Sequence, residues 1–197
     1  MRMKGFTLIE LAVVLAIIAV LAAILTPIVT NYIEQARIAR ASADARVVAD
    51  AIRLYQRDIG EYPIYDTTTE AIADNPGAAD QFIVGPAGAG IPSAGVAAWA
   101  SNVAVTTLTS YLNTNYLGRP TTAALGKASF RGPYLGSLEA DPWGNKFYVT
   151  AGNITRGSTK WGFVISAGPN GSLDTDPNTL RTGTLTPASD DIVAIIK

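Results

Sequence analysis

The sequence contains neither cysteine nor histidine, and these two absences limit its chemistry. Without cysteine the chain has no disulfide framework and no thiolate nucleophile. Without histidine it lacks the commonest general base and metal ligand, which excludes every Ser-His-Asp or Cys-His arrangement. The formal net charge of −1 gives no sign of electrostatic binding to nucleic acid. We therefore expect neither an enzyme nor a nucleic-acid-binding protein.

Polar side chains are scarce near the start of the chain. Arg2 and Lys4 precede an apolar run from Phe6 to Val29, and residues 11–25 contain no polar side chain at all. The 24 residues of this run would extend about 36 Å as a helix, enough to cross a hydrocarbon core of roughly 30 Å. The two cationic residues predict a cytoplasmic N-terminus, with the rest of the chain outside the cytoplasm.

Glu10 is the single charge inside this apolar run. A carboxylate costs roughly 2.5–3.5 kcal/mol at the centre of a bilayer, and less towards its edge. An ordinary secretory signal, with a cut near Ala22 and Ala23, has an uninterrupted apolar region of only about 7–15 residues. A plain membrane anchor explains the length of the run but does not explain why the run contains an acid. Glu10 is therefore a candidate functional residue that needs a partner.

The helical pattern continues beyond the apolar run. Apolar residues recur at alternating steps of three and four, which predicts a stripe on one helical face: Ile38, Ala41, Ala45, Val48, Ile52, Tyr55 and Ile59. Opposite charges four residues apart predict ion pairs on the other faces: Arg40 with Asp44, and Arg46 with Asp50. Gly60 is a stop signal. We predict one helix from Phe6 to Ile59, kinked or locally melted at Pro27, whose stripe packs on a globular domain.

The segment Gly5-Phe6-Thr7-Leu8-Ile9-Glu10-Leu11, after a short basic leader, resembles the class III signal of type IV pilins and type II secretion pseudopilins. The resemblance implies that a prepilin peptidase removes a leader of residues 1–5 by cutting after Gly5, and that Phe6 is then N-methylated. It also implies that Phe6, Glu10 and Pro27 serve the assembly of a homo-oligomeric helical filament.

Cleavage would give Glu10 a partner. The free α-amino group of Phe6 would have an unperturbed pKa of about 7.7–8.0, and a cation attracts a carboxylate strongly in a medium of low dielectric constant. Residues four apart share a face of a helix, so the pair could form within one chain. In the pilin-like family the pair is thought to join neighbouring subunits, and both alternatives stay open at this point.

Two further phrases, Gly60-Glu61-Tyr62-Pro63 and Asp141-Pro142-Trp143-Gly144-Asn145, resemble the major pseudopilin of type II secretion systems. The resemblance implies an α+β fold, in which a long N-terminal helix packs on a small antiparallel β-sheet. The expected parts are a transmembrane and filament-core helix over 6–30, its amphipathic half over 31–60, and a globular domain over 61–197. An insertion at about 64–131 has no strong pattern.

Three apolar segments predict the strands of the sheet. Lys146–Ala151 and Trp161–Ser166 read as a hairpin, and Ile192–Ile196 as a third strand. The Asp141–Asn145 phrase predicts a tight turn before the first strand, with Trp143 buried against the sheet. Within the insertion, the Gly- and Ala-rich stretch from 76 to 100 predicts surface loop. A short helix would follow, capped by Ser101 or Asn102 and presenting Val105, Leu108 and Leu112 on one face.

The acidic loop at 167–191 is a candidate metal site. Without histidine or cysteine, oxygen ligands suit a hard cation such as calcium. The spacing does not meet the EF-hand pattern, and solvated loop acids are an equal interpretation of it. The resemblance to the major pseudopilin implies calcium ligands from the side chains of Asn170, Asp190 and Asp191 and the carbonyls of Ala167 and Ala188. Asn170 stands where the family has a charged ligand, and Asp174 and Asp176 are possible substitutes.

The resemblance implies the major pseudopilin of a type II protein secretion system. It would be a single-pass protein of the bacterial inner membrane with its C-terminal domain in the periplasm. Its partners would be copies of itself, prepilin peptidase, minor pseudopilins and the inner-membrane assembly platform. One alternative is a type IV pilin of an extracellular surface fibre. An alternative of another class is a membrane-anchored calcium-binding or enzymatic ectodomain.

Overall fold

The computed structural model describes residues 5, 7–63, 81–96, 99, 108–115, 118, 121, 129–155 and 157–197. The chain divides into two compact units, residues 1–39 and 40–197, and each is described by itself. Phe6, most of the 64–131 segment, and the predicted helix cap at Ser101 or Asn102 lie outside the described residues.

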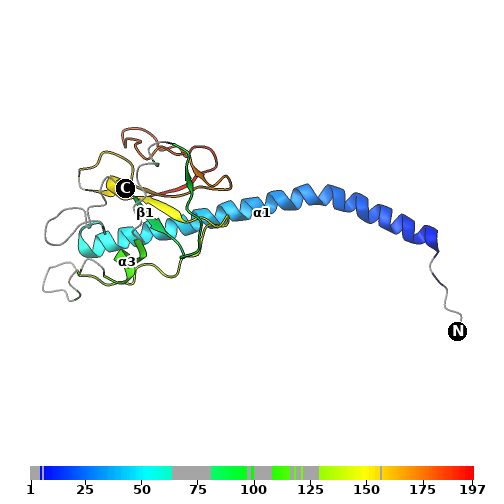
Figure 1. Ribbon diagram of the computed structural model, residues 1–197, viewed down its shortest axis with the longest axis horizontal. Coiled ribbons are helices and arrows are strands. Elements are labelled where there is room, and N and C mark those ends of the chain that lie inside the picture. The colour runs from blue at the N-terminus through cyan, green and yellow to red at the C-terminus, as the bar shows by residue number, and fades with distance from the viewer. Residues whose placement is uncertain are drawn as a thin grey trace. The chain divides into compact units, whose positions relative to one another are not determined.

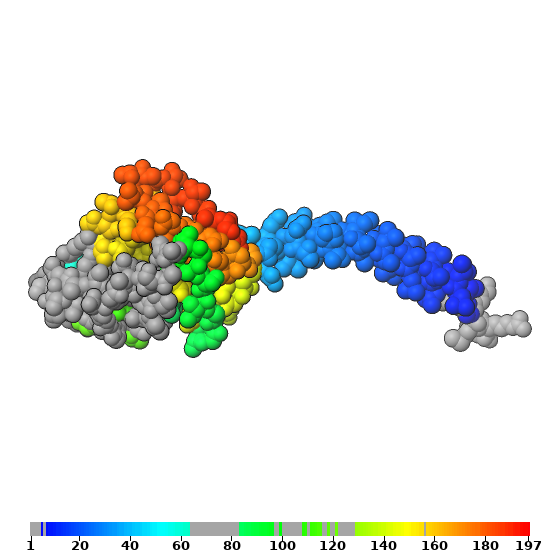
Figure 2. All heavy atoms as spheres, turned by 45° about the horizontal axis from the view of Figure 1, so that its top comes forward, coloured from blue at the N-terminus to red at the C-terminus, as the bar shows by residue number. Residues whose placement is uncertain are grey.

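The first unit is the apolar part of helix α1, whose full bounds are Leu8–Ile59. The described side chains from 7 to 33 are all exposed, as the blue spheres of Figure 2 show. An 18-residue window of this helix has a mean hydropathy of 3.1, and none of the window is buried. The helix is therefore long and apolar enough to cross a membrane, and it exposes the surface that lipid would cover.

Pro27 does not interrupt helix α1, so of the two predicted alternatives, a kink or a locally melted turn, the melted turn is absent. Hydroxyl groups on either side of the proline form additional hydrogen bonds with the backbone. The Thr26 hydroxyl donates to the Ala22 carbonyl at 2.7 Å, and the Thr30 hydroxyl donates to the Pro27 carbonyl at 3.0 Å. Such bonds help a helix to tolerate a proline where no water is present.

The second unit contains the C-terminal half of α1, and most of the predicted stripe is buried in it. The buried residues are Ala41, Ala45, Val48, Ala49, Ala51, Ile52, Tyr55 and Ile59. Ile38, at the start of the predicted stripe, is 43% exposed instead. The Arg40–Asp44 ion pair is confirmed, whereas Asp50 pairs with Arg53 at 2.8 Å rather than with Arg46. Gly60 ends the helix as predicted, with φ +85° and its N–H bonded to the Gln56 carbonyl.

A four-stranded antiparallel sheet packs on this half of the helix, which confirms the predicted α+β fold (Figure 1). Its strands, in spatial order, are β1 (Gln81–Val84), β3 (Phe147–Thr150), β4 (Phe163–Ser166) and β6 (Ile192–Ile195). Each of the three predicted strands is present within its predicted range. The prediction of continuous loop from 76 to 100 is wrong, because β1 forms there and pairs with β3.

Four further short elements lie in the described part of the second unit. Strands β2 (Ser93–Ala94) and β5 (Ser172–Leu173) form a separate parallel pair. Helix α3 spans Leu108–Asn113, and the 3₁₀ helix η1 spans Gly152–Ile154. Leu108 and Leu112, predicted to share one face of a short helix, are both fully buried in α3.

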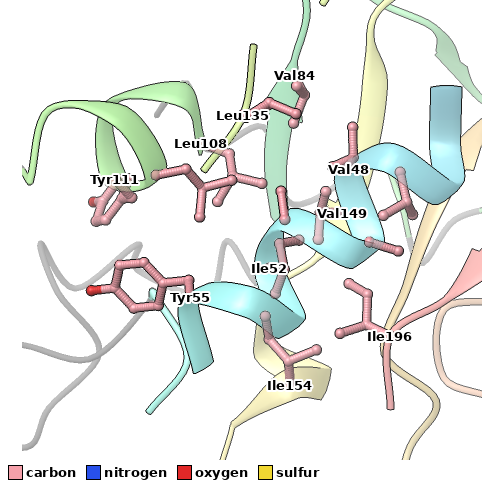
Figure 3. Close-up of a cluster of buried hydrophobic side chains, with 14 of the residues drawn as sticks. Val48, Ile52, Tyr55, Val84, Leu108, Tyr111, Leu135, Val149, Ile154 and Ile196 are labelled. Carbon is pink, nitrogen blue, oxygen red and sulfur yellow. The ribbon is translucent and has the colours of Figure 1, made fainter. Parts of the chain in front are cut away.

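Both faces of the four-stranded sheet are covered. One face packs against α1 and α3 in a core that includes Val48, Ile52, Val149 and Leu108 (Figure 3). The opposite face carries a second cluster, in which Trp99 and Leu173 cover Tyr148, Phe163 and Ile165. Because both faces are buried, β3 and β4 contain four consecutive buried residues each, without the polar alternation of a half-exposed strand.

The Asp141–Asn145 turn precedes β3, which is the second strand of the sheet in chain order. The turn is closed by hydrogen bonds between Asp141 and Asn145 and between Gly144 and Asp141, both of 2.9 Å. Trp143 is half-buried, so its predicted burial against the sheet is wrong. Trp99 has that role on the sheet, because it is 2% exposed and packs edge-on against Tyr148.

Candidate functional site

The first candidate site is the N-terminal end of helix α1. The helix begins at Leu8, so Thr7 occupies the capping position immediately before it. The Thr7 backbone N–H and hydroxyl both donate to Glu10 Oε2, at 2.9 and 2.8 Å. In return the Glu10 backbone N–H donates to Thr7 Oγ1 at 3.3 Å. This reciprocal arrangement is a capping box, with threonine as the cap and glutamate three residues later.

In this structure the Glu10 carboxylate is paired with Thr7, three residues before it. Phe6, the other half of the predicted charge pair, lies outside the described residues. Pairing within one chain and pairing between subunits therefore both stay predictions.

The surface around Glu10 is apolar. Ile9, Val13 and Val14 lie beside Glu10 on the exposed, open surface of the helix. A single carboxylate beside apolar side chains complements a group that combines a cation with an apolar side chain. An N-terminal phenylalanine is such a group, because its amine is attached directly to the residue that carries the ring.

The other predicted processing and assembly positions lie around this site in the sequence. Gly5 is exposed, and among the described residues no heavy atom outside its chain neighbours lies within 4 Å of where a Cβ would be. Phe6 lies outside the described residues, and Pro27 lies within the exposed apolar part of α1.

The second candidate site is the acidic loop between β4 and β6. The structure brings together several of the predicted ligands. The Asn170 backbone N–H donates to Asp190 Oδ2 at 2.8 Å, and the Asn170 side-chain amide donates to Asp174 Oδ2 at 2.9 Å. A Cβ on Gly168 would lie 2.3 Å from the Asp190 carbonyl oxygen, so the two ends of the loop are in close contact. Only glycine fits at that position, which also has φ +63°.

Asp191 is the most buried carboxylate of this loop, at 6% exposure. Its Oδ2 accepts three hydrogen bonds, from the Thr175 N–H at 2.6 Å, the Thr175 hydroxyl at 2.7 Å and the Asp174 N–H at 2.8 Å. Its Oδ1 is buried and has no hydrogen-bond partner among the residues that the structure describes. Burial raises the pKa of Asp191 above its ordinary value, and the hydrogen bonds from Thr175 and Asp174 oppose that rise.

The remaining predicted ligands differ in their placement. The Ala188 carbonyl accepts a hydrogen bond from the Asp191 N–H at 3.2 Å, so it lies beside the buried acid. Ala167, which is buried, directly precedes Gly168. Asp176 accepts from the Asn178 N–H within its own turn, and no contact links it to Asp190 or Asp191 among the described residues. Within that part of the chain, no three acidic side chains form a group that could hold a metal ion by themselves.

Sequence reasoning missed two features of these sites. The capping box has a sequence signal, a threonine three residues before a glutamate at the start of an apolar helix. The contacts of Thr175 with Asp191 have no such signal, because 15 residues separate the two in the chain and only the fold brings them together.

The comparisons with known proteins bear on the N-terminal site. Residues 1–26 match the family model described as the prokaryotic N-terminal methylation motif. No curated protein and no solved structure matches the chain. The matched segment contains Gly5, Phe6 and Glu10, and it is followed by the helix-on-sheet fold described above. The match over residues 1–26 therefore supports the resemblance of this N-terminal segment to type IV pilin-like substrates of prepilin peptidase.

Proposed function

We propose that the protein is a structural filament subunit and, specifically, the major pseudopilin of a type II protein secretion system. The observation that carries the filament role is the exposed apolar helix, which begins at an acid-containing methylation motif. The similarity of the Gly60–Pro63 and Asp141–Asn145 phrases to the major pseudopilin supports the specific assignment. The lack of histidine and cysteine supports a structural role rather than an enzymatic one.

The physical chemistry of the helix suggests how assembly would proceed. Lipid would cover residues 7–33 before assembly, and neighbouring helices would cover them in the filament. This exchange replaces one apolar environment, the lipid, with another, the neighbouring helices. Hydrophobic burial alone therefore supplies little net driving force for assembly. The Glu10 carboxylate and the amine of a neighbouring Phe6 would then fix the register of each added subunit, because an unpaired charge in such surroundings is costly.

The proposed orientation follows from the charges that flank the helix. Arg2 and Lys4 would keep the leader in the cytoplasm, where the active site of the prepilin peptidase would cut it, and the second unit would lie in the periplasm. Subunits added by one repeated rotation and translation that does not close would form a helical filament. Minor pseudopilins and an inner-membrane assembly platform would be the partners in that process.

A deletion strain would separate the secretion role from a surface-fibre role. Loss of protein export to the medium, with surface fibres retained, is the expected result. Loss of a surface fibre with export intact would assign the protein as a type IV pilin instead. Neighbouring genes that encode a secretion ATPase and a secretin would agree with the first result.

Glu10→Ala tests the assembly role of the acid. We expect the variant to insert in the membrane and to keep the fold of the second unit, because Glu10 forms side-chain hydrogen bonds only with Thr7 among the described residues. We expect filament yield to fall severely, since the incoming amine would have no counter-charge. The yield of sheared filaments, relative to membrane-inserted subunit, measures this effect. Glu139→Ala is the control, because that side chain is 81% exposed and its one ion pair within the described parts of the chain is with Arg40. Assembly of Glu10→Ala at the parental level would contradict the charge-pair account.

We also propose that the acidic loop binds calcium. The side chains of Asn170, Asp190 and Asp191 would hold the ion with the Ala167 and Ala188 carbonyls, and Asp174 is close enough to Asn170 to substitute. Oδ1 of Asp191 supports this proposal, because it is buried and has no hydrogen-bond partner among the described residues. Burial of such an oxygen without a partner is unfavourable, and a bound cation would compensate for the lost hydration. The ion would supply charge neutralisation and would join the loop to β6.

Thermal unfolding of the full chain in detergent, with calcium or with a chelator, tests this site. A ligand at about 100 times its dissociation constant stabilises a fold by roughly 2.7 kcal/mol, so Tm should rise by several degrees. Asp190→Asn is the matched variant, because it retains an acceptor for the Asn170 N–H but removes a charge, and it should reduce the rise. Magnesium should have a weaker effect, since it requires near-octahedral coordination. An unchanged Tm at millimolar calcium would contradict the proposal.

A further inference from the structure

We propose that part of the predicted insertion, residues 93–96 and Trp99, holds the acidic loop in the conformation that binds calcium, and that Trp99 is a positioning residue for the site. This inference rests on the proposed calcium site. It gives a role to a segment whose sequence has no strong pattern of its own.

Backbone hydrogen bonds attach strand β2 to the acidic loop, because β2 pairs in parallel with β5. The Ser93 N–H donates to the Gly171 carbonyl at 2.9 Å. The Gly95 N–H donates to the Leu173 carbonyl at 3.0 Å. These bonds fix the path of the loop backbone and use no carboxylate oxygen, so the acids of the loop are left for other partners.

The backbone that follows β2 lies directly against a candidate ligand. A Cβ on Gly95 would overlap Asp174 Oδ1 and would lie 2.6 Å from Ser172 Oγ. Asp174 Oδ1 accepts from the Ser172 hydroxyl at 3.2 Å, and its Oδ2 accepts from the Asn170 amide at 2.9 Å. Only a residue without a side chain fits at position 95 while Asp174 keeps this place.

Trp99 reaches the buried end of the same loop. Its indole N–H donates to the Thr175 carbonyl at 2.7 Å. The Thr175 N–H and hydroxyl donate to Asp191 Oδ2, and the hydroxyl oxygen accepts from the Ala188 N–H at 2.9 Å. Thr175 thus holds one oxygen of Asp191 in place, whereas Oδ1 has no hydrogen-bond partner in the described part of the chain.

The position of Trp99 is set by the core rather than by the loop. Its ring packs edge-on against Tyr148 and Phe163 on the sheet. A loop that only partly populates its binding conformation binds with an affinity reduced by that fraction. Because the bond from Trp99 to Thr175 orders the loop during folding, binding need not supply that conformational entropy, and calcium affinity should depend on this bond.

The test measures the Kd for calcium by isothermal titration calorimetry, on the full chain in detergent, at a temperature where circular dichroism shows an intact fold. Trp99→Phe keeps an aromatic ring but removes the N–H, and we expect Kd to rise about fivefold, the effect of one hydrogen bond. Trp161→Phe is the matched control. The Trp161 indole N–H donates at 3.0 Å to the Gly183 carbonyl, which is in the same loop but is not a proposed ligand, so Kd should stay parental.

Two variants of Thr175 test the other end of the connection, and they decide the question if Trp99→Phe does not fold. Thr175→Val keeps the shape and the backbone N–H but removes the hydroxyl that bonds to Asp191 and Ala188. We expect its Kd to rise about tenfold, because that bond is made to a charged group. Thr175→Ser keeps the hydroxyl and should bind calcium like the parent.

The outcomes separate positioning from general stability. A parental Kd in Trp99→Phe or in Thr175→Val would overturn the inference while calcium binding stands. An equal rise in Trp161→Phe would also overturn it, because loss of any tryptophan would then weaken the site. A weakened Thr175→Ser would show that the hydroxyl is not the group that matters. A parent chain that binds no calcium would overturn the proposed calcium site itself.

Discussion

Asp141 illustrates what a single buried carboxylate does in this fold. The residue is 3% exposed, and both of its oxygens accept hydrogen bonds. Oδ1 accepts from the backbone N–H groups of Trp143 and Asn145, at 3.1 and 2.7 Å, which shapes the turn before β3. Oδ2 accepts from the Ser166 hydroxyl at 2.7 Å, at the end of β4. The Ser166 oxygen in turn accepts from the Gly168 N–H, so Asp141 connects the turn to the start of the acidic loop.

Replacement of Asp141 by alanine should therefore destabilise the second unit. The substitution leaves the Ser166 hydroxyl and two backbone N–H groups without their acceptor, and about 2–4 kcal/mol is the expected loss for such buried groups. Thermal unfolding of the full chain in detergent measures the change. Asp176→Ala is the control, since Asp176 is exposed and bonds only within its own turn, and it should cost less than about 1 kcal/mol. Equal losses for the two variants would contradict the role given to Asp141.

At the scale of elements, helix α1 was predictable because its two halves follow simple rules. An unbroken apolar run predicts a helix for lipid, and steps of three and four predict a helix that packs on one face. The packing depends on what faces the helix, so the exposure of Ile38 and the burial of Ala49 and Ala51 could not be read from the period alone. The ion pair of Asp50 with Arg53 likewise depends on local side-chain geometry. Arg53 also donates to the Ile195 and Ile196 carbonyls, which brings it towards β6.

The strands differ in how much sequence signal they have. β3, β4 and β6 are compact apolar runs, and their ranges could be predicted. β1 has only four residues within a Gly- and Ala-rich segment, and its existence depends on pairing with β3, 66 residues later from Gln81 to Phe147. The contacts within the acidic loop likewise depend on residues that are distant in the chain. Its composition indicates oxygen ligands, but the pairing of Asp191 with Thr175 exists only after the chain has folded.

The whole molecule shows a division in where apolar surface is exposed. In the described part of the second unit, the sheet is covered on both faces, by α1 and α3 on one side and by Trp99 and Leu173 on the other. In the first unit every described side chain from 7 to 33 is exposed, and most are apolar. An exposed apolar surface of that kind is typical of a segment that lipid or other protein chains cover. The methylation motif at its start agrees with a membrane-anchored segment and with filament assembly in general.

We propose that the chain is cut between Gly5 and Phe6 and then methylated on the new amine, and that assembly depends on the resulting N-terminus. Mass spectrometry of the protein isolated from membranes of cells that contain prepilin peptidase tests this claim most directly. The account predicts a chain that begins at Phe6 and carries one added methyl group. A mature chain that retains Met1, or one that begins near Ala23, would contradict it.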